Sequence, residues 1–112
     1  MNYRPLRVGK LIRSELTSIL QREVEQEPGF LCTLTGVEVD KKLEHARISV
    51  SVMPPGKETE AMKRLKETQG ELQYLLMKKL NIKPLPKIEF VRDEGAENAA
   101  RIEKLLIEEQ QR

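Results

Sequence analysis

Four residues near the middle of the chain combine a spacing and a chemistry that suit contact with a polyanion. Lys63, Lys66, Gly70 and Tyr74 recur at intervals of three and four residues, so on an α-helix they share one face. Ammonium groups neutralise phosphates, an aromatic ring stacks on an unpaired base, and glycine lets another backbone approach closely. This face predicts a nucleic-acid-binding surface. The alternative for Tyr74 and Met77 is that a bend in the helix turns them into the core.

A second set of cations lies near the amino terminus, and charge alternates in blocks along the chain. Residues 1–22 carry five basic and one acidic side chain, and residues 61–92 carry eight and three, whereas 23–60 and 93–112 are acidic. Two basic blocks predict a positive face, and an ordinary solvated surface is the plainer alternative. The candidate RNA-binding residues are Arg4, Arg7, Lys10, Arg13, Lys63, Arg64, Lys66, Gly70, Tyr74, Lys78 and Lys79.

No arrangement of residues predicts catalysis, a metal or a cofactor. His45 is the only histidine and has no partner that the sequence can place, and Cys32 is the only cysteine. The adjacent acids Glu108 and Glu109 lie in a polar tail and are better explained as solvated charge. The sequence contains no phosphate-binding glycine loop. We therefore expect a binding protein that is not an enzyme.

Length and composition favour one small domain. The 112 residues suffice for a single core, which must be built from Leu, Ile and Val because the chain has two Phe, two Tyr and no Trp. A single cysteine favours a reducing compartment. No apolar run approaches the roughly 18 residues of a membrane span, and the amino terminus lacks the apolar stretch of a secretory signal. We expect a cytoplasmic protein with no membrane contact.

Hydrophobic periodicity predicts six elements. Residues 5–26 and 57–81 show the helical period, while 31–39, 45–53 and 87–92 are β-prone, the second of them alternating cleanly and pairing antiparallel with the first. A terminal helix follows a polar start at 93–98, with a narrow apolar stripe of Ile102, Leu105 and Leu106 and a frayed tail from Glu108. This order predicts an α+β fold, a three-stranded sheet with helices packed on one face.

A resemblance rests on four segments, residues 7–16, 37–40, 43–52 and 86–93. In order and spacing over nearly the whole chain, they resemble the ribosome-binding factor A family. The resemblance implies a type II KH-like domain in the order α-β-β-α-(kink)-α-β, residues 1–95, followed by a C-terminal helix at 96–112. No two glycines lie three residues apart, so the Gly-x-x-Gly loop of ordinary KH domains is absent. A helix–kink–helix at Thr68-Gln69-Gly70 replaces it in the resemblance.

The resemblance also implies a function and partners. Members bind the free small (30S) ribosomal subunit and 16S rRNA, support late maturation including processing of the 5′ end of 16S rRNA, and do so without catalysis. It further implies release assisted by a ribosome-associated GTPase, and we expect a monomer. A general KH-like RNA-binding module, or a protein-interaction module that docks a partner on its third strand or terminal helix, remains the alternative.

Overall fold

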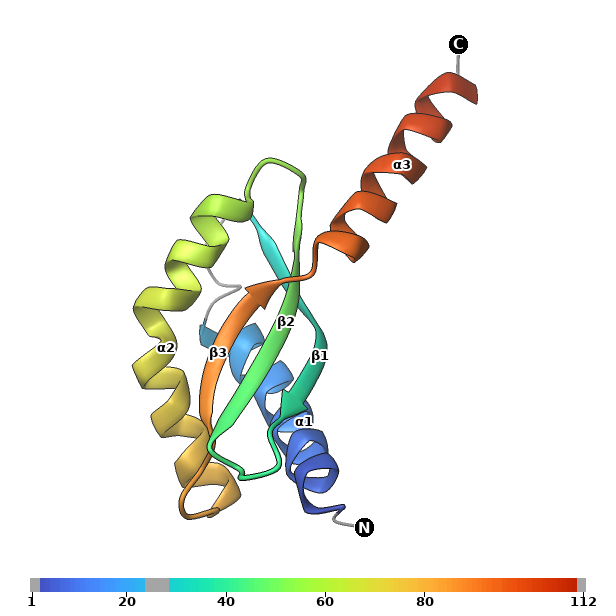
Figure 1. Ribbon diagram of the computed structural model, residues 1–112. Helices are drawn as coiled ribbons and strands as arrows, with labels where there is room; N and C mark the ends of the chain where they lie inside the picture. Colours follow the sequence, from blue (N-terminus) through green and yellow to red (C-terminus); the bar gives the residue numbers. More distant parts are fainter. Residues whose placement is uncertain (1–2, 24–28, 111–112) are drawn as a thin grey trace.

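The computed structural model describes residues 3–23 and 29–110, which form three helices and three strands (Figure 1). All three strands have the predicted bounds. The first helix begins one residue earlier than predicted, and residues 24–26 of that prediction lie outside the described residues. The elements are α1 (Arg4–Glu23), β1 (Leu31–Val39), β2 (His45–Met53), α2 (Glu58–Leu80), β3 (Lys87–Arg92) and α3 (Glu94–Gln110).

The three strands form one mixed sheet in the order β1-β2-β3. β1 and β2 pair antiparallel, as predicted, with one irregularity in register between Leu34 and Gly36. β3 runs parallel to β2, because α2 carries the chain back across the sheet before β3 begins. β3 is therefore an edge strand, and its outer side lies next to α2 (Figure 1).

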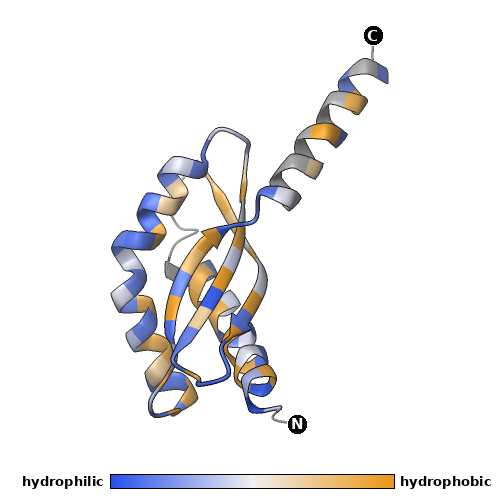
Figure 2. Ribbon diagram, in the orientation of Figure 1, coloured by the Kyte–Doolittle hydropathy of each residue, from blue (hydrophilic) through white to orange (hydrophobic). Residues whose placement is uncertain are grey.

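α1 and α2 cover one face of the sheet, and the core lies between them and the strands (Figure 1). The alternation predicted for β2 is confirmed, since its even-numbered residues from 46 to 52 are buried. Both predicted helical stripes are buried too, and polar residues dominate the outer side of α2 (Figure 2). The buried helical residues include Val8, Ile12, Leu16, Ile19 and Leu20 in α1, and Ala61, Leu65, Leu72 and Leu76 in α2.

The two helices that the resemblance implies on either side of Gly70 form one continuous element. α2 is one α-helix of 23 residues from Glu58 to Leu80 (Figure 1). Its core stripe keeps one phase on both sides of the glycine, since Leu65 and Leu72 are both fully buried against the same core. A break would rotate one half of that stripe out of the core, which costs more than the roughly 1 kcal/mol of a glycine in a helix.

Thr68, two residues before Gly70, also fits a continuous helix. Its hydroxyl donates to the carbonyl oxygen of Arg64 at 2.8 Å and lies 3.4 Å from that of Leu65. Such a bond back to the preceding turn satisfies the hydroxyl inside a helix. The helix ends at Asn81, which adopts a left-handed conformation and donates its N–H to the carbonyl oxygen of Met77 at 3.1 Å.

α3 stands apart from the two helices that cover the sheet (Figure 1). It begins at Glu94, and the helix continues through Gln110, into the part predicted to fray. It projects away from the sheet, so the molecule measures 56 × 34 × 18 Å (Figure 1). The radius of gyration is 15.7 Å, against about 13 Å for a compact domain of this length. Only α1 and α2 thus cover the sheet.

Candidate nucleic-acid interface

The side chain of Gln73 fixes the distance between α2 and the edge of the sheet. Its Nε2 donates to the carbonyl oxygen of Pro86 at 2.9 Å, and its Oε1 accepts the N–H of Ile88 at 2.8 Å. The amide therefore pairs with the outer edge of β3 as a neighbouring strand would. On the other side, β3 pairs with β2. Nothing in the periodicity of the sequence marks Gln73 for this role.

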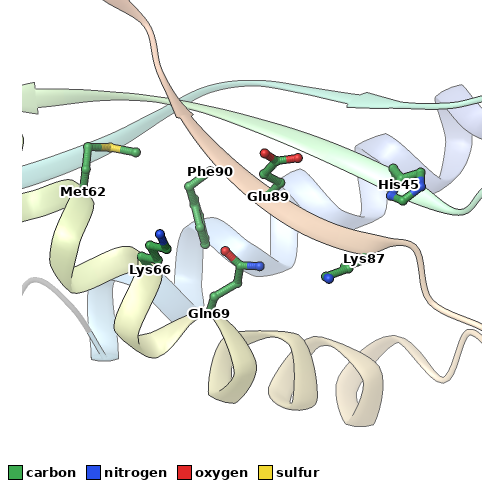
Figure 3. A pocket seen from close by; sticks show the side chains of 7 residues that line it. All are labelled: His45, Met62, Lys66, Gln69, Lys87, Glu89 and Phe90. Atoms are coloured by element: carbon green, nitrogen blue, oxygen red, sulfur yellow. The ribbon is translucent and has the colours of Figure 1, made fainter.

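Beside this contact lies a groove between α2 and β3, which we call the α2–β3 groove. It has a volume of about 540 Å³. Phe90 lies between the helix and the strand, close to Lys66 and Gln69, while His45 and Lys87 lie toward one end (Figure 3). An aromatic ring close to one ammonium group, with a second ammonium group in the same groove, suits a ligand that has both a flat face and negative charge. The groove is lined by His45, Met62, Lys66, Gln69, Lys87, Glu89 and Phe90.

The predicted outer face of α2 meets this groove at Lys66. We call Lys63, Lys66, Gly70, Tyr74 and Met77 the α2 stripe; all five are exposed, as predicted. Lys66 belongs to both the stripe and the groove, which joins the two surfaces. Tyr74 is 53% and Met77 38% exposed, so the alternative that they turn into the core is wrong.

Tyr74 also has a cationic neighbour within the helix. The Nζ of Lys78 lies 5.5 Å from the centre of the Tyr74 ring, within the range of a cation–π contact. Lys78 and Lys79 occupy the last turn of α2, where positive charge also favours the helix dipole. Lys78 therefore has a structural role in addition to its predicted one.

Gly70 leaves open space on the stripe. A Cβ built on Gly70 meets nothing within 4 Å apart from the helix's own nearby backbone. Gly29 and Gly56 have positive φ, but Gly70 lies inside a regular helix and has no such requirement. Neither packing nor backbone conformation thus explains a glycine at this position, and it leaves the backbone open to a close approach from outside.

The cations of α1 line two other grooves. Arg4 and Arg7 line a groove with Ile82, just beyond the end of α2. Lys10 and Arg13 line a different groove with residues 37–39 of β1. Arg64 is half-buried. The structure therefore places Lys63, Lys66 and Lys78 along the stripe, while the four cations of α1 line other grooves.

The turn between β1 and β2 holds His45 at the end of the groove. The Oδ1 of Asp40 accepts the backbone N–H of Glu44 at 2.8 Å and that of His45 at 3.3 Å. Loss of solvent raises the pKa of the Asp40 carboxyl, but these hydrogen bonds and the charge of His45 outweigh it, so the pKa is lower than usual. The ionised form of Asp40 therefore stabilises the turn.

A buried acid holds the other end of α2. Glu58 is 6% exposed; its Oε2 accepts the N–H of Gly56 at 2.8 Å, and its Oε1 lies 4.0 Å from Nη2 of Arg92. A carboxylate in the first turn of a helix is also favoured by the helix dipole. The contact ties the start of α2 to the end of β3, so that Gln73 and Glu58 together frame the groove.

The described residues offer no arrangement for metal chemistry. Among residues 3–23 and 29–110, no group of three or more His, Cys, Asp or Glu side chains could hold a metal ion. Cys32 is buried in β1. In the same part of the chain, no helix is long and apolar enough to cross a membrane.

Fold and site together define a small KH-like α+β domain with a cationic helix–strand groove. The family model of ribosome-binding factor A matches residues 4–106, and the chain belongs to this family. It is 34% identical over 116 residues to the ribosome-binding factor A of Pseudomonas aeruginosa, with 97% of this chain and 90% of the relative covered.

Solved structures of the family share the fold. The crystal structure of ribosome-binding factor A from Thermus thermophilus matches with a TM-score of 0.68 at 19% identity, covering 80% of this chain and 97% of that chain. A Thermus thermophilus homology model fitted into a cryo-EM map of its complex with the 30S subunit matches with a TM-score of 0.57 at 20% identity, covering 72% and 90%.

Proposed function

We propose that this protein is a ribosome assembly factor that binds the free small (30S) ribosomal subunit and its 16S rRNA. In this role it supports late maturation, including processing of the 5′ end of 16S rRNA, without catalysis of its own. Membership of the ribosome-binding factor A family supports the proposal, and so does the 30S complex of the Thermus thermophilus protein. The observation that carries it within this chain is the exposed α2 stripe beside the α2–β3 groove.

The stripe and the groove suit one strand of RNA. Lys63 and Lys66 would neutralise successive phosphates and release counterions. Gly70 would let the sugar–phosphate backbone lie close to the helix, and the exposed ring of Tyr74 would stack on an unpaired base. Lys63 and Tyr74 are eleven residues apart, or about 17 Å along the helix axis, a length that accommodates several nucleotides.

Binding of this kind explains an effect on RNA processing without an active site. A protein that holds one conformation of the rRNA presents the 5′ end to separate nucleases and releases the subunit when the conformation is complete. We further propose that the protein acts as a cytoplasmic monomer and that a ribosome-associated GTPase assists its release. Residues 1–95 would carry the RNA contacts.

A charge reversal on the stripe tests the proposal. In a sucrose gradient of a cell lysate, the unchanged protein should co-sediment with free small subunits and largely avoid translating ribosomes. The double variant Lys63→Glu/Lys66→Glu should bind at least tenfold more weakly and lose part of its salt dependence. Both side chains are exposed, so the melting temperature should change little.

The matched control is Lys41→Glu/Lys42→Glu, in the turn between β1 and β2. Both lysines are exposed, and the change in net charge is the same. Any difference between the two variants therefore comes from position and not from overall charge. Equal weakening would show that only net charge matters, and equal distribution of the unchanged protein along the gradient would overturn the proposed function.

A further inference from the structure

We propose that α3 is a docking surface for a basic protein of the small ribosomal subunit and not a further RNA-binding element. The inference rests on the proposed function, because the partner is part of the small ribosomal subunit to which the protein is proposed to bind. It assigns a role to the helix that projects from the domain and whose main contact with the rest of the fold is a limited one with β2.

The first observation is exposed apolar surface that the fold leaves uncovered. Ile102 is 59%, Leu106 54% and Ile107 55% exposed. Ile102 and Leu106 are four residues apart and so are neighbours on one side of the helix. Apolar residues appear on α3 well away from the sheet (Figure 2). Large apolar side chains gathered on a projecting helix mark an interaction site.

The second observation is that α3 lacks the packing that stabilises helices in proteins. Every residue of α3 whose exposure the structure describes is exposed. Most helical stability comes from tertiary packing of an amphipathic face, and an isolated helix of this length is marginal in water. A partner that covers Ile102 and Leu106 would supply the missing contacts.

The third observation is charge, which decides the class of partner. From Glu94 to Gln110 the chain carries five acidic and two basic residues, a net charge of −3. Glu103 and Glu108 are exposed near the apolar residues. Carboxylates are repelled by phosphates, so this helix is poorly suited to lie on RNA. A basic protein surface complements it.

The sign of a charge-reversal effect separates the two classes of partner. If α3 docks on a basic protein, Glu103→Lys/Glu108→Lys should weaken binding to purified small subunits about tenfold, although it makes the chain more positive. If α3 lies on RNA, the same variant should bind more tightly, which would overturn the inference. Both changes lie on an exposed surface and should leave the fold intact.

The matched control places the same reversal on α2. Glu67 and Glu71 are exposed on the outer side of the helix that carries the α2 stripe. Glu67→Lys/Glu71→Lys should strengthen binding, because it adds cations beside the proposed RNA contacts. Opposite signs for the two variants are the expected result. Equal strengthening of both would show that α3 responds to RNA as α2 does.

A second variant tests the apolar contact. Ile102→Ala/Leu106→Ala keeps helix propensity and should weaken subunit binding about tenfold or more, as expected for buried anchors in an interface. Leu31→Ala is the control: it is 48% exposed on β1, the strand farthest from β3, and should bind normally. Unchanged binding of the α3 variant would overturn the inference.

A photo-crosslinker in place of Ile107 identifies the partner directly. On the bound small subunit it should label a basic ribosomal protein. Labelling of 16S rRNA, of a second copy of this chain or of its own α2 would overturn the inference while leaving the proposed function in place. If the unchanged protein fails to bind small subunits at all, the proposed function fails, and this inference fails with it.

Discussion

Replacing Gly70 by alanine separates the stability of α2 from its proposed contact with RNA. The glycine lies inside a regular helix, and a Cβ at this position meets nothing within 4 Å outside the helix's own nearby backbone. The added methyl group therefore brings no clash. Gly70→Ala removes the conformational entropy that glycine loses on folding, which corresponds to a gain of about 0.5–1 kcal/mol in unfolding free energy.

For a chain of 112 residues this gain raises the melting temperature by roughly 2–4 °C. In the proposed complex the same methyl group occupies the space that the RNA backbone approaches, so binding to the small subunit should weaken several-fold. Thermal unfolding by circular dichroism and a subunit-binding titration measure the two effects. The variant should thus be more stable and bind less well.

Ser18→Ala provides the control, because Ser18 is exposed on α1 and away from the α2 stripe. It should also raise stability by a few tenths of a kcal/mol, without any effect on binding. A loss of stability in Gly70→Ala would show that the backbone at residue 70 is not helical, and the account of α2 as one helix would be wrong. Unchanged binding would remove Gly70 from the interface.

Three further predictions concern the frame of the groove. Gln73→Ala leaves the buried N–H of Ile88 and the carbonyl of Pro86 without their partner, so unfolding free energy should fall by about 2 kcal/mol. An unchanged denaturation midpoint would show that Gln73 does not stabilise the packing of α2 against β3. Glu58→Gln should lower it by about 1 kcal/mol, and a higher midpoint would contradict the stabilising role of its charge. Folding lowers the pKa of the Asp40 carboxyl, so the ionised carboxylate stabilises the folded protein. This stabilisation is complete above the ordinary pKa of 3.8 and is lost as the pH falls through the lower pKa of the folded protein. When unfolding free energy is measured against pH, Asp40→Asn should therefore lose less stability below pH 3.8 than the unchanged protein does. Identical curves for the two proteins would contradict this.

The strands were predictable because their side-chain period is short and one face is buried. In β2, apolar residues at 46, 48, 50 and 52 alternate with polar ones, which fixes both the element and its inner face. The same holds for the buried stripes of α1 and α2. These patterns reflect local geometry, so the sequence of one segment is enough to predict the element and its buried face.

The direction and position of β3 depend on contacts between distant segments. Its parallel pairing with β2 follows from the path of α2, and its outer edge is held by Gln73, whose partners lie 13 and 15 residues further along the chain. A glutamine among other polar residues of a helix carries no periodic signal. The groove and its residues Phe90 and Lys87 could not be foreseen for the same reason.

The continuity of α2 past Gly70 shows how two local patterns compete. Gly70 lowers helix propensity, but Leu65, Leu72 and Leu76 continue one buried stripe past it. Burying three leucines stabilises the continuous helix by several kcal/mol, against about 1 kcal/mol for the glycine. The core stripe was the stronger evidence. The exposed position of Tyr74, by contrast, followed correctly from the helical wheel.

The most direct test of the central claim is photo-crosslinking from position 74 on the free small subunit. A benzophenone side chain in place of Tyr74 keeps an aromatic ring at an exposed site on the α2 stripe. The account predicts a crosslink to 16S rRNA that Lys63→Glu/Lys66→Glu abolishes. A bound protein that crosslinks from this position only to ribosomal proteins would contradict it.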